Sequence, residues 1–177
     1  MISNASPLIY LGKLNKLDLL IKLFDKIEIT SSVYEEVICE DDTNKPEVEI
    51  IKGFINRKLI IVNKLEDKTK EQSNFIRKSF KIHTGESDTI ALAIQGNSKR
   101  VLIDEKYARK AAELHGLFPI GTLGVVLLAY KKEIILEKEV KDIMDELISG
   151  NFRMGAEVLN EFWKLFDLLK KDRKNNY

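Results

Sequence analysis

Four side chains with oxygen donors stand where a parallel α/β fold would gather them. Asn4 and Asp104 each directly follow a short apolar run of the sequence. Glu36 and Glu86 lie in segments with a helical pattern. Residues just past the carboxyl ends of parallel strands line the crevice where ligands bind in such folds. Carboxylates gathered there repel one another unless a cation lies between them, so the pattern indicates a Mg²⁺ or Mn²⁺ site.

Each of the four residues also has an ordinary structural interpretation when it is taken alone. Asp104 could cap the helix that follows it, and Glu86 could complement the positive end of its own helix. Glu36 could belong to a salt bridge, and Asn4 could form an Asx turn before Pro7. The set is more informative than its members, because a parallel sheet brings together strand ends and helix starts that are distant in sequence.

The length, composition and net charge of the chain limit the class of protein to which it can belong. The 177 residues fit one domain that is large enough to bury a core without disulfides. Hydrophobic residues make up 44% and charged residues 32%, which is typical of a globular protein. With 29 Lys and Arg against 28 Asp and Glu, the formal net charge is +1. Binding to nucleic acid would therefore depend on a local basic patch.

Cysteine content and hydropathy predict the compartment. The single cysteine, Cys39, has no partner for an internal disulfide. The chain opens without a secretory apolar region, and no apolar run approaches the length of a membrane span. We therefore expect a cytoplasmic protein with no membrane segment.

Short apolar strands alternate with amphipathic helices, which predicts a parallel sheet with helices on both faces. Strands are expected at residues 2–3, 26–30, 59–62, 100–103 and 119–120. Helices are expected over 7–24, around Glu36, and over 46–57, 66–82, 86–94, 105–115, 122–131, 137–149 and 156–170, with a loop over 41–45 and a frayed tail over 170–174. The two histidines, His83 and His115, lack metal-ligand spacing, which excludes a zinc site built on a histidine pair.

Local signals predict where several helices begin and end. Ser6 is a candidate N-cap for the first helix, and Ser32 with Glu35 forms a capping-box signature. Gly85 is expected to interrupt the chain between two helices, and the pair Gly96-Asn97 to end the second of them. The expected buried stripe of the 66–82 helix is Phe75, Ile76 and Phe80.

Five sequence blocks occur in a fixed order along the chain. They are SNASPLI at 3–9, VYEEV at 33–37, GESDTIALA at 85–93, LIDE at 102–105 followed by Ala108-Arg109, and GTLG at 121–124. In this combination the chain resembles PIN-domain proteins, in the branch similar to the ribonuclease toxins of prokaryotic toxin–antitoxin pairs. The blocks run from the first residues to about Leu128, and beyond Ile134 only a helical pattern remains.

The resemblance implies a fold and a set of site residues. The fold would be a three-layer α/β/α sandwich with a central parallel sheet, in a single domain over 1–177 with a helical C-terminal extension from about residue 134. An acidic cluster would bind Mg²⁺ or Mn²⁺ and cleave RNA. Asn4 takes the place of the usual first aspartate, and Glu36 matches the glutamate of the second helix. Glu86 occupies the third acidic position, and Asp104 matches the aspartate after the central strand.

Further residues would assist this cluster. Asp88 and Glu105 could reach the same metal or a second one, and Ser6 could donate a hydrogen bond to Asn4 or to a phosphate. Arg109 could bind an RNA phosphate, although an ion pair with Glu105 is at least as well supported. Gly121-Thr122-Leu123-Gly124 more readily forms a tight turn into the next helix, and a substrate contact from Thr122 is the lesser alternative.

The leading hypothesis is a metal-dependent ribonuclease that acts as the toxin of a toxin–antitoxin pair. RNA, an antitoxin protein and a second copy of the chain would be its partners, with Trp163 and Phe166 as interface candidates. The runner-up is a catalytically silent PIN-like module that binds RNA or protein, since the Asn4 amide supplies no charge to a metal. A receiver-like phosphoacceptor domain is weaker still, because that fold needs a lysine near the end of its last strand and residues 119–121 offer none.

Overall fold

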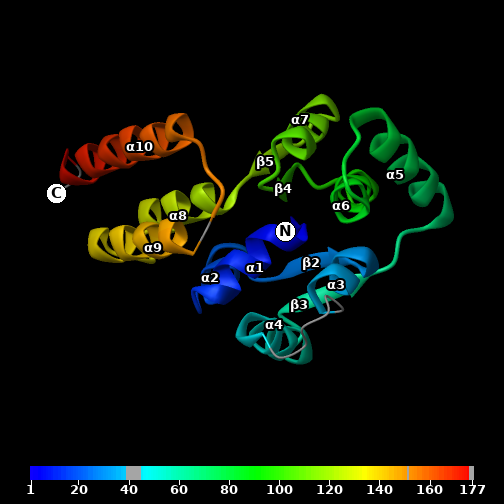
Figure 1. Ribbon diagram of the computed structural model, residues 1–177, viewed down its shortest axis with the longest axis horizontal. Coiled ribbons are helices and arrows are strands. Elements are labelled where there is room, and N and C mark those ends of the chain that lie inside the picture. The colour runs from blue at the N-terminus through cyan, green and yellow to red at the C-terminus, as the bar shows by residue number, and fades with distance from the viewer. Residues whose placement is uncertain (39–44, 151, 176–177) are drawn as a thin grey trace. The chain divides into compact units, whose positions relative to one another are not determined.

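The computed structural model describes residues 1–38, 45–150 and 152–175 (Figure 1). Cys39 and most of the predicted loop over 41–45 lie outside the described residues. The backbone forms two compact units, Met1–Thr122 and Leu123–Tyr177. A single domain over 1–177 therefore stays a prediction.

The first unit contains a five-stranded parallel sheet, as the sequence predicted. Its strands are β1 (Ile2–Ser3), β2 (Ile27–Thr30), β3 (Ile60–Asn63), β4 (Arg100–Leu102) and β5 (Phe118–Ile120). The strand order is β3-β2-β1-β4-β5, and every neighbouring pair is parallel. The chain thus builds the sheet outward from β1 in one direction and then crosses back to add β4 and β5 on the other side.

Helices connect the strands, as a parallel sheet requires. In the first unit they are α1 (Ala5–Lys13), α2 (Asp18–Phe24), α3 (Ser31–Ile38), α4 (Pro46–Asn56), α5 (Asp67–Phe80), α6 (Thr84–Gln95) and α7 (Lys106–Leu114). The helix expected over 7–24 is two helices, because the chain turns at Asn15 with a φ of 52°. The end of α6 at Gly96 and Asn97 is as predicted, with Gly96 as C-cap and a positive φ at Asn97.

Three predicted helix starts were wrong. The N-cap of α1 is Asn4 rather than Ser6. The first turn of α3 is capped by Thr30, whose Oγ1 accepts the Val33 N–H at 3.3 Å, so Ser32 lies inside the helix. Contrary to the prediction, Gly85 does not lie between two helices but occupies the first turn of α6.

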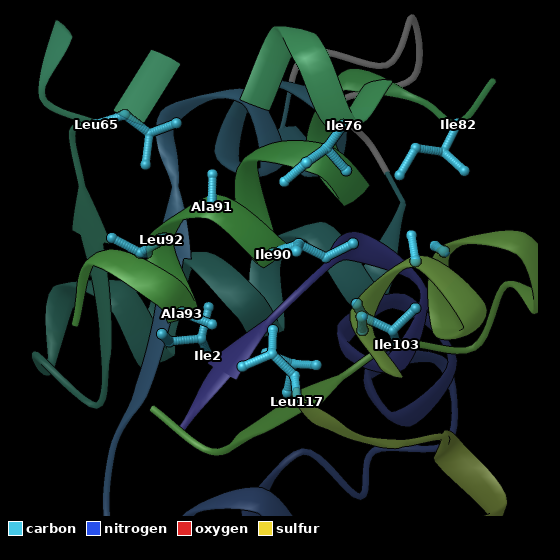
Figure 2. Close-up of a cluster of buried hydrophobic side chains, with 14 residues drawn as sticks. Ile2, Leu65, Ile76, Ile82, Ile90, Ala91, Leu92, Ala93, Ile103 and Leu117 are labelled. Atoms are coloured by element: carbon cyan, nitrogen blue, oxygen red, sulfur yellow. The ribbon is translucent and has the colours of Figure 1, made fainter. Parts of the chain in front are cut away.

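One hydrophobic core of the first unit lies between β1, β4 and the helices α5, α6 and α7. Figure 2 shows Ile2 from β1, Ile90 from α6 and Ile103 after β4 in this cluster. Val101 and Ile103 both belong to it, and Leu102 between them does not, as the alternation of side chains along a strand requires.

The predicted stripe of α5 was partly wrong. Ile76 is buried and Phe80 is half-buried, but the side chain of Phe75 is 68% exposed. The buried face of α5 carries Ser73 one turn before Ile76 and Thr69 two turns before it. Two small hydroxyl residues therefore lie on the buried face of α5, and the aromatic ring of Phe75 lies off it.

The second unit is helical. It contains α9 (Glu137–Ser149) and α10 (Ala156–Asn175), and nearly all of α8 (Thr122–Lys131). Phe166 of α10 is 1% exposed and packs against the Tyr130 ring at a centroid distance of 4.8 Å. Residues 170–174 continue α10 rather than fraying, since Arg173 lies over the same ring at 4.6 Å.

No helix among the described residues has the length and apolar character needed to cross a membrane.

Candidate functional site

Asn4 and Asp104 lie at the carboxyl edge of the sheet, where the strand order reverses. β1 and β4 are neighbours in the sheet, and the chain leaves them toward opposite sides of it. Ligands of open α/β sheets bind outside the carboxyl ends of strands at such a switch point. Asn4 follows β1 and its N–H donates to the Leu102 carbonyl at 3.0 Å, so Asn4 and Asp104 end neighbouring strands.

Asn4 carries an unpartnered polar atom. The residue is 3% exposed, and its Oδ1 is buried without a hydrogen-bond partner. Although Asn4 is the N-cap of α1, its side chain makes no capping bond and its Oδ1 has no partner, so the Asx turn suggested as its structural alternative is absent. A buried acceptor left unpaired costs about 1–3 kcal/mol, which makes it unusual in a folded protein. This oxygen is free to bind a group that approaches the strand end.

Asp104 is held by the start of the segment that follows β5. Its Oδ1 accepts the Thr122 N–H at 2.6 Å and its Oδ2 accepts the Thr122 hydroxyl at 2.7 Å. A Cβ added to Gly121 would lie 2.9 Å from Asp104 Oδ1, so a side chain there would crowd the carboxylate. Thr122 is fully buried, which gives it a role in orienting Asp104 rather than in contacting substrate.

Burial raises the pKa of the Asp104 carboxyl. The two hydrogen bonds from Thr122 and the nearby Arg109 guanidinium lower this pKa, and the Glu105 charge raises it again. Arg109 donates from Nη1 to the Ile103 carbonyl at 3.0 Å. The structure describes both Arg109 and Glu105, and they form no ion pair, so Arg109 is held beside Asp104 by the backbone.

Glu86 lies in the first turn of α6 and is 7% exposed. Its Oε2 accepts the His83 N–H at 2.8 Å, which satisfies one of the free donors at the helix start. Burial raises the pKa of the Glu86 carboxyl, the hydrogen bond and charge of His83 lower it, and the Glu105 charge raises it. Because Glu105 acts on both Glu86 and Asp104, these three carboxylates share one electrostatic neighbourhood.

Glu36 approaches the same helix from α3. A Cβ added to Gly85 would lie 2.5 Å from Glu36 Oε2 and 3.3 Å from Val33 Cγ2. Glu36 is exposed, so this carboxylate lies at the outer side of the α6 start while Glu86 is buried within it. The Glu36 carboxylate can lie this close to the α6 backbone because Gly85 has no Cβ.

Two further sequence candidates, Asp88 and Ser6, make no described hydrogen bond to Asn4, Glu86 or Asp104. Both carboxylate oxygens of Asp88 accept hydrogen bonds from serine hydroxyls, one from Ser32 and one from Ser73. Ser6 is half-buried in the first turn of α1, and its described side chain makes no hydrogen bond to Asn4.

The oxygen atoms of the candidate residues are of the types that bind hard divalent cations. Asn4 Oδ1, Glu86 and Asp104 offer the carbonyl and carboxylate oxygens that Mg²⁺ and Mn²⁺ prefer. Within the described residues no three His, Cys, Asp or Glu side chains are close enough to hold a metal ion. Asn4 is an amide, so it is not among those residue types, and the Glu105 charge contributes to the raised pKa of both Glu86 and Asp104.

A pocket of about 240 Å³ lies elsewhere, and none of the candidate residues lines it. Its lining includes Met1, Glu28 and Asn63 together with the end of α6. Asn63 Nδ2 donates to Glu28 Oε2 at 2.6 Å, so these two polar groups already satisfy each other. The carboxyl edge of the sheet therefore remains the better candidate for chemistry.

Sequence reasoning missed the residues that position the carboxylates. Gly85 leaves space beside Glu36 and Gly121 beside Asp104, and Thr122, expected only as a substrate contact, binds both Asp104 oxygens. Both glycines stand in the quoted blocks, GESDTIALA and GTLG, next to a residue that was singled out. The position of each glycine next to a candidate residue was a usable signal in the sequence. Which carboxylate lies against each glycine depends on helix packing, which the sequence does not reveal.

The chain belongs to the PIN-domain family: residues 1–167 match the family model described as DUF3368, a PIN domain. The match extends through most of both compact units. PIN domains are typically nucleases and commonly bind Mg²⁺. No curated protein matches the chain with significant similarity.

We expect Gly85→Ala to stabilise the protein less than the same change at Gly53. A Cβ at Gly53, within α4, would meet no atom within 4 Å, so Gly53→Ala should raise the free energy of unfolding by about 0.5–1 kcal/mol. Gly85→Ala must displace the Glu36 carboxylate and press on Val33, which offsets that gain. Urea denaturation of both variants measures the difference, and an equal gain would contradict the close approach of Glu36.

We expect Glu86→Gln to be more stable than the wild type at pH 7 in a chelating buffer. Because burial raises the folded-state pKa of Glu86, the ionised carboxylate destabilises the folded chain above that pKa. As pH falls through the raised value, the wild type takes up the proton and regains stability. The advantage of the variant should therefore shrink toward about pH 4, near the unfolded pKa. Urea denaturation at pH 7 and at about pH 4 measures the difference in unfolding free energy between the variant and the wild type. A difference that does not change with pH would contradict the raised pKa of Glu86.

Proposed function

We propose that this protein is a metal-dependent ribonuclease that hydrolyses RNA phosphodiester bonds, and that it is the toxin of a toxin–antitoxin pair. The observation that carries the proposal is the unpartnered Asn4 Oδ1 at the strand end beside Asp104, with Glu86 at the neighbouring helix start. Membership of a family that is typically composed of nucleases supports the reaction class.

The residues that would hold Mg²⁺ or Mn²⁺ are Asn4, Glu86 and Asp104, with Glu36 and Glu105 at the outer side. When bound, such a cation supplies a water of lowered pKa and neutralises charge that develops on the phosphoryl oxygens. Each Asp104 oxygen accepts one hydrogen bond from Thr122 and keeps lone-pair capacity for a further partner. Thr122 thereby fixes the direction in which this carboxylate can bind.

The charges of the candidate site favour the binding of a divalent cation together with an RNA phosphate. Burial raises the pKa of Glu86 and of Asp104, so the folded chain disfavours their ionised forms. A divalent cation would relieve that cost, and the phosphate of an RNA substrate would then complete its coordination. Arg109, held beside Asp104 by the Ile103 carbonyl, adds a fixed positive charge that supports phosphate binding.

RNA, an antitoxin protein and a second copy of the chain are the proposed partners. For a protein partner, the exposed apolar side chains of α10 are the better candidates: Val158, Leu165 and Leu168. Phe166, an interface candidate from sequence, is buried in the second unit, and Trp163 is half-buried beside it.

A second candidate function is supported by Asn4 itself. A catalytically silent PIN-like module that binds RNA or protein would tolerate an amide at this position. The same reading is favoured by the lack of three acidic side chains close together among the described residues.

We expect Asn4→Asp to bind Mn²⁺ more tightly than the wild type. The change keeps the size of the side chain and adds a negative charge at an oxygen that is already buried and unpartnered. Removing the charge of a metal ligand weakens binding in a hard-cation site, so the gain should be about tenfold or more. Calorimetric Mn²⁺ titration measures both affinities, and equal values would exclude Asn4 from the metal shell.

We expect the wild type to cleave structured RNA in the presence of Mn²⁺ and Asp104→Asn to lose that cleavage by at least about 100-fold. The variant keeps the size of the side chain but removes the charge that would bind the cation. A panel of structured RNAs incubated with each protein, with and without chelator, provides the measurement. Tight RNA binding without cleavage under any divalent cation would instead support the silent module.

A further inference from the structure

Asp88 joins three helices through its carboxylate. Ser32 of α3 donates its hydroxyl hydrogen to Asp88 Oδ2, and Ser73 of α5 donates to Asp88 Oδ1, each at 2.5 Å. Asp88 itself lies on α6, which packs against both of the other helices. The carboxylate therefore has one hydrogen bond to each neighbouring helix.

The hydroxyl from α3 is part of a longer chain of hydrogen bonds. The Thr30 and Ser32 hydroxyls lie 2.9 Å apart, and Thr30 Oγ1 accepts the Val33 N–H. Because the Ser32 hydrogen is given to Asp88, Thr30 is the donor to Ser32. A continuous path thus runs from the capped start of α3 to the Asp88 carboxylate, and hydrogen bonds in such chains reinforce one another.

This contact lies beside the approach of Glu36 to α6. Ser32 and Glu36 are four residues apart on α3 and share one face of it, as do Gly85 and Asp88 at three residues apart on α6. Ser32 binds Asp88, and one turn further along α3 the Glu36 carboxylate lies against Gly85. The two helices therefore meet at two points, one of which is the candidate site.

α3 needs such an anchor. It has eight residues, of which only Val33 and Val37 are buried, and a helix of this length has little stability of its own. Glu36 is exposed, so burial contributes little to the placement of its carboxylate. The hydrogen bond from Ser32 to the Asp88 carboxylate is a polar contact that ties this face of α3 to α6.

We propose that Asp88 is a positioning residue that holds Glu36 in place through Ser32, and that it does not bind the metal itself. The catalytic meaning of that position rests on the proposed function, whereas the tie between Asp88, Ser32 and Glu36 does not. The two Asp88 oxygens accept hydrogen bonds from hydroxyls on two different helices, Ser32 on α3 and Ser73 on α5, so the carboxylate is directed toward these helices.

The two serines provide a matched pair of variants. Ser32→Ala and Ser73→Ala each remove one hydroxyl from the same carboxylate. Only Ser32 lies on a helix with a candidate site residue, since α5 carries none. Ser32→Thr restores a hydroxyl and serves as the rescue, and Asp88→Asn removes the charge while its amide can still pair with both serines.

The experiment compares these variants by two measurements. The side-chain carboxyl carbon resonance of Glu36 reports its surroundings with or without metal, and Mn²⁺ titration reports the consequence for the site. We expect Ser32→Ala to shift the Glu36 resonance and to weaken Mn²⁺ binding about tenfold. Ser73→Ala should leave the resonance in place and the Mn²⁺ affinity within about twofold, and Ser32→Thr should restore both. Asp88→Asn should have a smaller effect than Ser32→Ala.

Three results would overturn the proposal. One is an unmoved Glu36 resonance in Ser32→Ala. Another is equal loss of Mn²⁺ affinity in Ser32→Ala and Ser73→Ala, which would mean a general loss of packing. The third is a large loss in Asp88→Asn with none in Ser32→Ala, which would make Asp88 a metal ligand. If the wild type binds no Mn²⁺ and cleaves no RNA, the proposed function fails, and the Glu36 resonance still decides whether Asp88 positions this side chain.

Discussion

The parallel pairing of β1 with β4 is the constraint on which the site depends. It sets Ser3 opposite Leu102, and the next hydrogen bond, from the Asn4 N–H to the Leu102 carbonyl, extends the ladder beyond β1. Two strands that are distant in sequence therefore end side by side, and the chain leaves them toward opposite sides of the sheet. A crevice at that point follows from the topology alone. The helices α3 and α6 carry Glu36 and Glu86, whose carboxylates lie beside Gly85 and on the His83 N–H at the start of α6.

Holding this cluster together has a cost in stability. Burial works against the charges of Glu86 and Asp104, and the amide oxygen of Asn4 lacks a partner. The chain offsets part of the cost locally, through the His83 N–H at Glu86 and through both donors of Thr122 at Asp104. The remainder is the kind of unfavourable arrangement that functional sites retain and that a bound cation would relieve.

Much of the fold could be predicted from sequence, because strand and helix signals are local. The strands were located within a residue or two, and α8 and α9 agree with their predicted bounds. The helix starts were less predictable: Ser32 has the composition of a cap, but Thr30 takes that role and frees Ser32 to bind Asp88. Likewise, the burial of Ser73 in place of Phe75 follows from the Asp88 partner on α6, which no periodicity reveals. The candidate acids could be named from sequence, whereas the contacts that orient them come from tertiary packing.

The central claim is that Asn4, Glu86 and Asp104 form one divalent-cation site at the carboxyl edge of the sheet. Anomalous diffraction from a crystal grown with Mn²⁺ tests it most directly, because the ion is located without reference to activity. The account predicts a peak within coordination distance, about 2.0–2.3 Å, of Asn4 Oδ1 and of oxygens from both carboxylates. A Mn²⁺ peak that is bound elsewhere, or bound here without Asn4, would contradict it.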